Sequence, residues 1–212
     1  RDCLLSRGLG DVYKRQSYRV PWLFDEESVD VCRKFTKLKC RLMPYLYGKA
    51  VEAHEHGVPM MRPMMLEFPD DPACDMLDRQ YMLGDSLLVA PIFRKDGEVQ
   101  YYLPDGTWTS LLDGGKVEGG HWQTEIHDFM SLPLMVRPGT VLPLGAHDDR
   151  PDYDYLDGVE LHVYQLADGE SETVEIPDTK GNVAATFTVT MKDGQAQVET
   201  DSTKPYTVVV HQ

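Results

Sequence analysis

Apolar residues recur at three- and four-residue steps through the first quarter of the sequence. They are Val31, Phe35, Leu38, Leu42, Leu46 and Ala53. This spacing puts the side chains on one face and predicts an amphipathic helix. Asp25 fits the N-cap, and Gly57 fits the residue that ends the helix. Pro44 lies inside the predicted helix, where it should remove one backbone hydrogen bond and kink the axis.

Short apolar runs follow the predicted helix. Residues 59–68 are apolar and bounded by prolines, which predicts a strand buried on both faces. Residues 69–84 predict a turn and a short helix that closes at Gly84, and residues 86–93 predict a second buried strand. The order helix, buried strand, helix is typical of an α/β unit.

After Arg94 the pattern changes to short segments in which apolar and polar residues alternate. Asp-Gly occurs six times, at 96–97, 105–106, 113–114, 157–158, 168–169 and 193–194. Because Asp-Gly tolerates the positive φ of tight turns, we expect hairpins at most of these pairs. The segments predict a nearly helix-free, antiparallel β-sandwich region. A change in composition predicts a break between two β-units within residues 145–158.

The first 16 residues differ from the rest. Residues 1–16 are basic, have no periodicity and begin without Met. They resemble translated adapter sequence, so we expect a non-native leader that packs against nothing. The predicted fold is therefore an α/β segment followed by β-domains.

Charge and cysteine content narrow the class of protein. The formal net charge is −14, which disfavours nucleic acid and anionic membranes as partners. No apolar stretch approaches the roughly 20 residues of a membrane span. Cys32 and Cys40 lie eight residues apart on the predicted helix, a rise of about 12 Å, which a disulfide cannot span. We therefore expect free, buried thiols and a cytoplasmic protein.

Four carboxylates are candidates for acid–base chemistry. Glu67, Asp70 and Asp71 follow the predicted strand 59–68, and Asp85 precedes the next apolar run. Glycoside hydrolysis uses a pair of such groups. The same residues also suit turns and helix caps, and this structural role is the more common one.

Arg62 lies inside the predicted buried strand, where a guanidinium must pair with an acid or with carbonyl groups. A structural ion pair is the favoured role, and contact with substrate is the alternative.

Other polar and aromatic residues give weaker signals. His54 and His56 are two apart on the predicted helix and point about 200° apart, so they cannot share a metal ion. His121 and His127 have no partners at ligand spacing. The sequence predicts no metal site and no cofactor, because no phosphate-binding loop, GxSxG or HExxH motif occurs.

Four aromatic residues cluster in the β-region, namely Tyr101, Tyr102, Trp108 and Trp122. They suit either a platform on which a sugar stacks or the core of a sandwich, and the core is the more frequent use.

Several long stretches resemble the bacterial α-xylosidases of glycoside hydrolase family 31. Residues 17–47 look like a late helix of the family's barrel, and residues 59–91 look like its last barrel strand and exit. YYLPDGTWTSLLDGG at 101–115 and SLPLMVRPGTVLPLG at 131–145 are similar to its proximal C-terminal β-domain. From about residue 148 the chain resembles the start of the distal β-domain.

The resemblance implies an organisation. Residues 17–93 would form the end of a (β/α)8 barrel, residues 94–147 a proximal β-domain and residues 148–212 an incomplete distal β-domain. Residues 59–68 would then lack a barrel neighbour, which should leave apolar side chains partly exposed and favours association, including a homo-oligomer. The side chains concerned are Met60, Met61, Met64, Met65, Leu66 and Phe68.

The resemblance also implies a function. The family hydrolyses α-linked sugars with retention, using one Asp as nucleophile and another as acid/base, both on strands that precede Ser17. The chain would then be an inactive C-terminal fragment with no catalytic residue, its substrate-binding residues are unknown, and the parent would act on α-xyloside oligosaccharides. An α-glucosidase is the nearest alternative, and a non-catalytic carbohydrate-binding β-sandwich is an alternative of another class.

Overall fold

The computed structural model describes residues 20–212, which divide into two compact units at Thr36. The 3-10 helix η2 (Pro21–Leu23) and the start of α2 (Glu26–Arg41) belong to the first unit. Asp25 caps α2, because its Oδ1 accepts a hydrogen bond from the Ser28 amide at 2.7 Å. The cap is thus confirmed, whereas the leader predicted for residues 1–16 lies outside the described residues.

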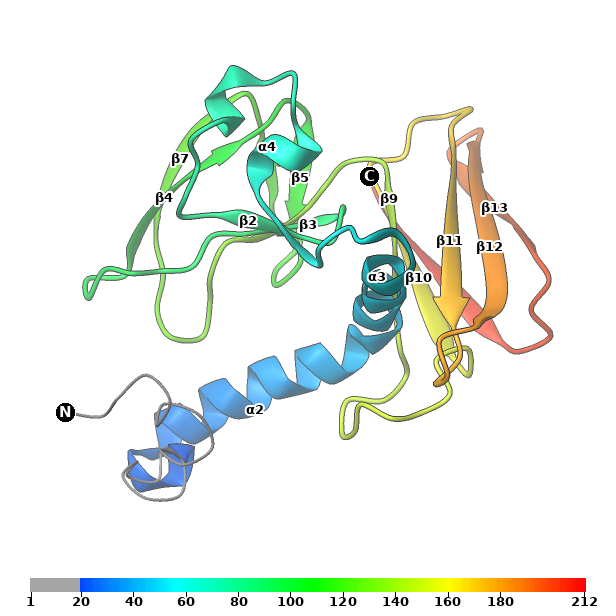
Figure 1. Ribbon diagram of the computed structural model, residues 1–212, viewed down its shortest axis with the longest axis horizontal. Helices are drawn as coiled ribbons and strands as arrows, with labels where there is room; N and C mark the ends of the chain where they lie inside the picture. The colour runs from blue at the N-terminus through cyan, green and yellow to red at the C-terminus, as the bar shows by residue number, and fades with distance from the viewer. Residues whose placement is uncertain (1–19) are drawn as a thin grey trace. The chain divides into compact units, whose positions relative to one another are not determined.

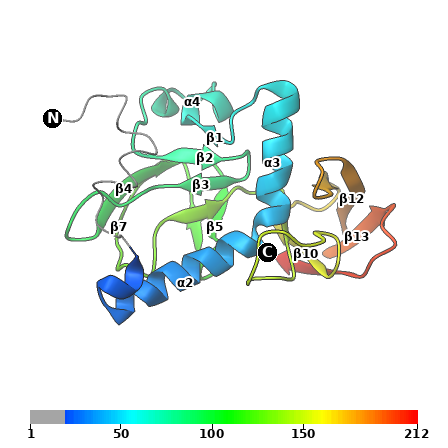
Figure 2. The same cartoon turned by 60° about the horizontal axis from the view of Figure 1, so that its bottom comes forward.

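The long predicted helix is divided in two. Helix α2 ends at Arg41 and α3 (Met43–His56) begins after Leu42, so the disruption expected at Pro44 is confirmed as a break (Figure 2). Pro44 has no amide hydrogen to donate to the carbonyl of Cys40, four residues earlier. The Tyr153 hydroxyl, from the β-region, donates to that carbonyl at 2.7 Å. Helix α3 ends at Gly57, as predicted, with φ 73°.

Gly145 makes a second contact with the helix break. The Gly145 amide donates to the Arg41 carbonyl at 2.7 Å, and the Arg41 Nε donates back to the Gly145 carbonyl at 3.0 Å. A Cβ on Gly145 would lie 1.8 Å from the Tyr153 hydroxyl oxygen, so only glycine fits there. Arg41 also donates to Glu160 at 2.6 Å. The carbonyls exposed by the helix break are therefore satisfied by the β-region.

The first β-region is built around a six-stranded sheet in the order β1-β2-β3-β8-β5-β6 (Figure 1). Its strands are β1 (Met61–Arg62), β2 (Tyr81–Leu83), β3 (Leu87–Val89), β5 (Thr107–Ser110), β6 (Lys116–Glu118) and β8 (Leu134–Val136). A separate antiparallel pair joins β4 (Glu98–Leu103) to β7 (His121–Ile126). Every neighbouring pair in the large sheet is antiparallel. Fully buried Met82, Leu88, Tyr101, Leu103 and Trp108 share its core.

The second β-region is a sandwich of two three-stranded sheets (Figure 1). One sheet has the order β14-β10-β9 and the other the order β11-β12-β13. The strands are β9 (Thr140–Leu144), β10 (Val159–Tyr164), β11 (Ser171–Pro177), β12 (Val183–Lys192), β13 (Gln195–Thr200) and β14 (Tyr206–His211). Leu161 and Val163 from one sheet share a core with Ile176, Phe187 and Val189 from the other. Strands β10 and β14 are parallel, whereas the sequence predicted antiparallel pairing throughout.

The order of strands and helices predicted for residues 59–93 is wrong. Residues 59–68 form the two-residue strand β1 followed by the short helix α4 (Met64–Glu67), and the predicted helix within 69–84 is a 3-10 turn, η3 (Pro72–Cys74), followed by β2. Pro63 precedes α4, and this turn brings Glu67 back to Arg62. Because β1, β2 and β3 share a sheet with β8, the structure has no boundary at 93/94.

The expected exposure of residues 59–68 is partly confirmed. Met61, Met65 and Leu66 are 60%, 52% and 49% exposed, but Met64 is fully buried beneath the sheet. The antiparallel sheet, in place of a barrel wall, supplies the cover for Met64.

The turn predictions are confirmed in part. The glycine of every Asp-Gly pair has positive φ, but only 113–114 and 193–194 lie in tight hairpins, β5–β6 and β12–β13. No helix occurs within residues 95–212, as expected. The break predicted within 145–158 is wrong, since β9 and β10 pair across that window and the chain changes sheets between β8 and β9.

The helix break allows a direct energetic test. Tyr153→Phe should lower the free energy of unfolding by about 1–3 kcal/mol, because it leaves the buried Cys40 carbonyl unpaired. In a Pro44→Ala background the cost should shrink, because the alanine introduced at position 44 can donate its own amide to that carbonyl. Denaturant unfolding of the two single variants and the double variant measures the coupling.

Tyr155→Phe is the matched control, because Tyr155 donates to the carbonyl of Pro151 in a loop. Tyr155→Phe should lower the free energy of unfolding by the same amount in the unaltered and the Pro44→Ala backgrounds. Equal costs of Tyr153→Phe in the unaltered and the Pro44→Ala backgrounds would contradict the assignment.

Candidate functional site

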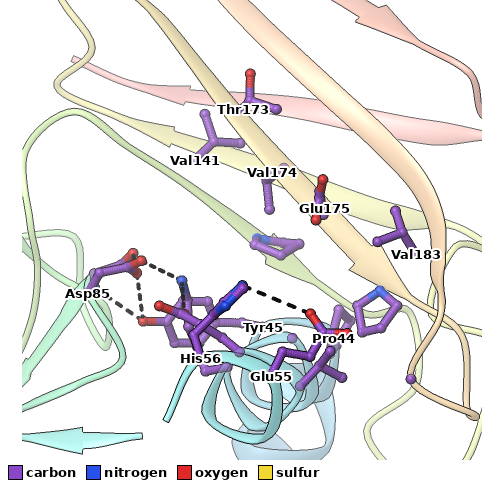
Figure 3. A pocket seen from close by; sticks show the side chains of 18 of the residues that line it. Pro44, Tyr45, Glu55, His56, Asp85, Val141, Thr173, Val174, Glu175 and Val183 are labelled. Atoms are coloured by element: carbon purple, nitrogen blue, oxygen red, sulfur yellow. Dashed lines mark hydrogen bonds and ion pairs between the residues drawn. The ribbon is translucent and has the colours of Figure 1, made fainter. Parts of the chain in front are cut away.

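A cavity lies between helix α3 and strands β9 and β11 (Figure 3). It has a volume of about 690 Å³. The helix lines it with Tyr45, Lys49, Glu52 and His56, which recur at steps of three and four and so share one face. We call this cavity, with the Asp85–Ser86 turn at its edge, the α3 cleft.

The strands supply the opposite wall of the α3 cleft. Strand β11 places Glu172, Val174 and Glu175 along it, and β9 adds Val141 and Pro143. The lining therefore combines apolar side chains with charged groups that are mostly acidic.

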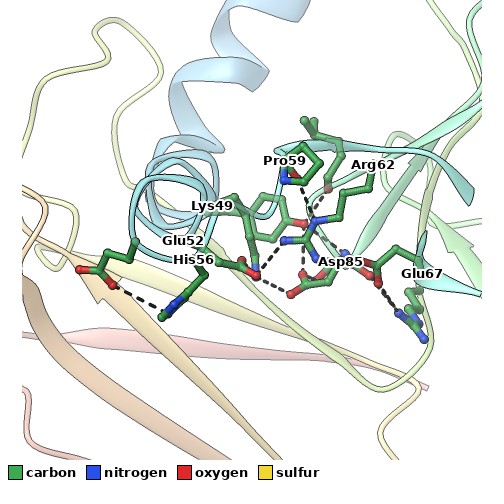
Figure 4. Close-up of polar contacts among 12 residues, drawn as sticks. Lys49, Glu52, His56, Pro59, Arg62, Glu67 and Asp85 are labelled. Carbon is green, nitrogen blue, oxygen red and sulfur yellow. Dashed lines mark hydrogen bonds and ion pairs between the residues drawn. The ribbon is translucent and has the colours of Figure 1, made fainter.

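A polar network borders the cleft and shares Lys49, Glu52 and Asp85 with it (Figure 4). Arg62 is buried at its centre, with a side chain only 5% exposed. Its Nη1 donates to Glu67 Oε1 at 2.7 Å and its Nε donates to the Pro59 carbonyl at 3.0 Å. Its Nη2 lies 2.9 Å from Glu52 Oε1 as an ion pair without hydrogen-bond alignment. The structural ion pair predicted for Arg62 is confirmed.

Two further cations complete the network. Lys49 donates to Asp85 and lies 3.1 Å from Glu52 Oε2. Arg137 Nη1 contacts Glu67 Oε2 at 3.2 Å and the Asp85 carbonyl at 3.4 Å, and its guanidinium lies over the Phe68 ring. Each of these three carboxylates thus touches at least one cation.

Hydrogen bonds fix Asp85 from a second side. The Tyr45 hydroxyl donates to the Leu83 carbonyl at 2.7 Å and lies 3.4 Å from Asp85 Oδ1. Ser86 donates its hydroxyl to Asp85 at 2.6 Å, and its amide donates to the Tyr45 hydroxyl at 3.1 Å. The β2–β3 turn is thereby tied to α3.

Burial and neighbouring charges shift the pKa values of Asp85, Arg62 and Tyr45. Burial would raise the pKa of Asp85, but attraction to Lys49 and hydrogen bonds from Lys49 and Ser86 keep that pKa below its usual value. Burial opposes the charge of Arg62, yet Glu67 and Glu52 raise its pKa. Burial and the charge of Asp85 raise the pKa of the Tyr45 phenol, which therefore stays neutral.

The pKa of Glu172, on the far wall of the cleft, is shifted in the opposite direction from that of Asp85. Partial burial, and then the negative charge of Asp85, raise its pKa.

The four candidate carboxylates have separate environments. Glu67 and Asp85 join one network, whereas Asp71 caps η3 through the Ala73 amide and accepts from the Tyr102 hydroxyl at 2.9 Å. Asp70 is exposed. Retaining hydrolysis needs one carboxyl that can give up a proton and a second that is free to attack. Glu67 and Asp85 are instead held by cations, which suits a structural role.

The aromatic residues mainly form core. Trp108 and Tyr101 are fully buried, and Tyr102 is 8% exposed. Trp122 is 58% exposed and packs on the Tyr102 ring at 5.9 Å between centroids. The structure therefore favours the core interpretation for three of the four.

Within residues 20–212, no group of three His, Cys, Asp or Glu side chains is arranged to hold a metal ion. His54 and His56 are exposed at the end of α3. Cys40 and Cys74 are buried free thiols, as expected, whereas Cys32 is free but exposed, and Cys3 lies outside the described residues. No helix of residues 20–212 is long and apolar enough to cross a membrane.

Sequence reasoning missed Tyr45, Lys49 and Arg137. The first two share a helix face with Glu52, and this spacing was a usable signal. Arg137 lies 70 residues from its partner Glu67, and no local pattern indicates such a pair.

Comparison with known families accounts for most of the chain. Residues 10–49 match the TIM-barrel domain of glycosyl hydrolases family 31, and residues 57–142 match the C-terminal domain of that family. Residues 154–212 match the C-terminal domain of the α-xylosidase YicI. The chain belongs to glycoside hydrolase family 31.

Within this family, the curated relatives that it resembles include two α-xylosidases. It is 42% identical over 193 residues to an α-xylosidase of Emericella nidulans, covering 86% of this chain and 25% of the relative. It is 40% identical over 200 residues to the α-xylosidase XylQ of Lactiplantibacillus pentosus, covering 92% and 26%. The chain thus spans about a quarter of the length of these relatives. α-Glucosidases are also among its relatives.

A solved structure shows the same fold. The cycloalternan-forming enzyme of Listeria monocytogenes, in complex with a pentasaccharide substrate, matches with a TM-score of 0.78 and 27% identity. The match covers 93% of this chain and 20% of that one.

The buried ion pairs predict a large mutational effect. Arg62→Met should lower the free energy of unfolding by about 3–5 kcal/mol, because Glu67 keeps a buried charge with fewer partners. Arg94→Met is the control, since Arg94 forms exposed pairs with Asp96 and Glu98 and should barely matter. Urea unfolding measures both, and equal effects would show that burial of the Arg62 pairs contributes nothing.

The network also predicts a response to acid. The pKa of Asp85 is lower in the folded chain than its value of about 3.9 when unfolded. The ionised group therefore stabilises the fold above pH of about 4, and this stabilisation is lost as the pH falls through the folded pKa. Asp85→Asn should flatten the fall of the unfolding free energy below that pH, whereas Asp70→Asn should not. Identical acid profiles for Asp85→Asn and the unaltered chain would refute this.

Proposed function

We propose that the chain is the C-terminal part of a retaining α-glycosidase that hydrolyses terminal α-xylosides. The supporting observation is its 42% and 40% identity to two α-xylosidases over most of its length. The match of residues 154–212 to an α-xylosidase C-terminal domain supports the same sugar. The substrate of the parent enzyme would be an α-xyloside oligosaccharide.

In this proposal, the catalytic residues of the parent enzyme lie outside this chain. The nucleophile and the acid/base would be two Asp residues of the barrel that precede Ser17. Support comes from Glu67 and Asp85, which are held by Arg62, Arg137 and Lys49 and are poorly suited to attack or to give up a proton. This chain would then supply no catalytic residue.

The proposed domain arrangement follows the sheets. Residues before Gly57 would be the end of the barrel, which the TIM-barrel match over 10–49 supports. Residues 57–136 would be the proximal β-domain and residues 140–212 the distal one, in line with the change of sheets between β8 and β9.

Two alternatives are weaker. An α-glucosidase is supported by relatives with that activity, but the two α-xylosidases share more identity with this chain. A stand-alone carbohydrate-binding sandwich would not need the α2–α3 break that Tyr153 and Gly145 satisfy.

We also propose a cytoplasmic location and self-association. The free thiols of Cys32, Cys40 and Cys74 support the first. Exposed Met61, Met65 and Leu66 support the second, because contiguous exposed apolar side chains favour contacts between molecules.

The test compares the chain with the longer protein encoded by its parent gene. With aryl α-xyloside and aryl α-glucoside as substrates, the chain alone should give no turnover. The parent should hydrolyse the xyloside with a higher kcat/KM than the glucoside.

Two outcomes would contradict the proposal. Turnover by residues 17–212 that disappears in Glu67→Gln or Asp85→Asn would place the active site in this chain. A parent that prefers the glucoside would replace the xylosidase assignment with the α-glucosidase one.

A further inference from the structure

Two histidines face each other between strands β10 and β14. His162 Nδ1 and His211 Nε2 are 3.0 Å apart, and the two rings lie within 19° of parallel. On the other side of His162, Nε2 is 3.0 Å from Glu160 Oε2, which also accepts the hydrogen bond from Arg41. The Tyr164 ring stacks on His211 at 4.3 Å.

The partners define where the protons lie. Glu160 is an acceptor, so His162 Nε2 must carry a hydrogen, and in the neutral ring Nδ1 is then an acceptor. His211 Nε2 must therefore donate to His162 Nδ1. One extra proton can be accommodated by reversing this bond, but a second makes both facing nitrogens donors and destroys it.

The surroundings oppose the second proton. Arg41 at the end of α2 and Lys116 on β6 are the cations that act on this cluster, and Glu160 is its anion. Burial, then the charges of His162 and Lys116, lower the pKa of His211. The neutral form of His211 therefore stabilises the fold above the unfolded pKa of about 6.5, and this contribution is lost as the pH falls below it.

Strand β14 is paired on one side, and the histidine contact lies at the end of this pairing. Within residues 20–212, it lies at the edge of its sheet and pairs with β10 alone, over six residues from Tyr206 to His211. Its side chains are at most half-buried, and its end is also held by the Gln165 amide and side chain, which donate to the His211 carbonyl. A strand with so little cover is the kind of element that opens locally.

We propose that the His162–His211 pair is an acid-labile clasp, which holds the C-terminal strand β14 against β10 at neutral pH and releases it when both imidazoles are protonated. Glu160 contacts both His162 and Arg41, so the histidine pair is connected to the end of α2, where the helix meets the sandwich. Acid would loosen the edge of the sandwich beside that joint while leaving the β11–β12–β13 sheet in place.

The test is amide hydrogen exchange of the full chain at pH 7.5 and pH 5.0, corrected for the intrinsic rate. The protection of residues 206–211 should fall at least about tenfold at pH 5.0, a loss of about 1.4 kcal/mol. Protection of residues 183–192 should stay the same. His211→Gln should remove the pH dependence, because an amide can either donate to or accept from His162 Nδ1.

His121→Gln is the matched control, because His121 is exposed on β7 in another sheet, and it should behave like the unaltered chain. Unchanged protection of β14 in the unaltered chain would overturn the proposal. So would a His211→Gln variant that loses protection at pH 5.0 as the unaltered chain does. The readout involves no sugar, so its result is independent of the proposed α-xylosidase function.

Discussion

The structure of residues 37–212 depends on how one helix break is satisfied. Pro44 leaves the Cys40 carbonyl without its helical donor, and an unpaired buried carbonyl costs about 1–3 kcal/mol. Tyr153 and Gly145 supply donors to the Cys40 and Arg41 carbonyls. A break that would destabilise an isolated helix thus becomes the joint that attaches the helix to the sandwich.

The same logic applies to the charged groups at the α3 cleft. Arg62, Lys49 and Arg137 come from a short strand, a helix and the end of β8, and they meet carboxylates from three different segments. Removing one partner would leave a partly buried charge with fewer contacts, which destabilises the fold. Glu67 and Asp85, which the sequence offers as acid–base candidates, instead form the ion pairs of this cluster.

Local signals predicted local features well. Pro44, Asp25 and Gly57 indicated a break, a cap and a helix end, because each acts on the few residues beside it. Arg62 was correctly expected to pair, because a buried guanidinium has few alternatives. The resemblance to family 31 supplied the rest of the functional picture, and the comparisons confirm the family.

Long-range pairing was where sequence reasoning failed. The apolar run 59–68 predicts a barrel strand wrongly, because its period cannot distinguish a buried strand from a two-residue edge followed by a helical turn. The boundary at 145–158 failed because β9 finds its partner on the far side of a polar loop. Lys49 and Arg137 acquired their roles only when distant segments met.

The parallel pairing of β10 with β14 has a consequence for the order of assembly. The hairpins β11–β12 and β12–β13 close over short turns, so they can form early and from local contacts. Strand β14 must instead return across the whole of residues 165–205 to reach β10. Closing that long loop is entropically costly until the intervening sheet is in place. During synthesis, β10 would therefore leave the ribosome with one edge open, and the sheet could be completed only after residue 211 has emerged.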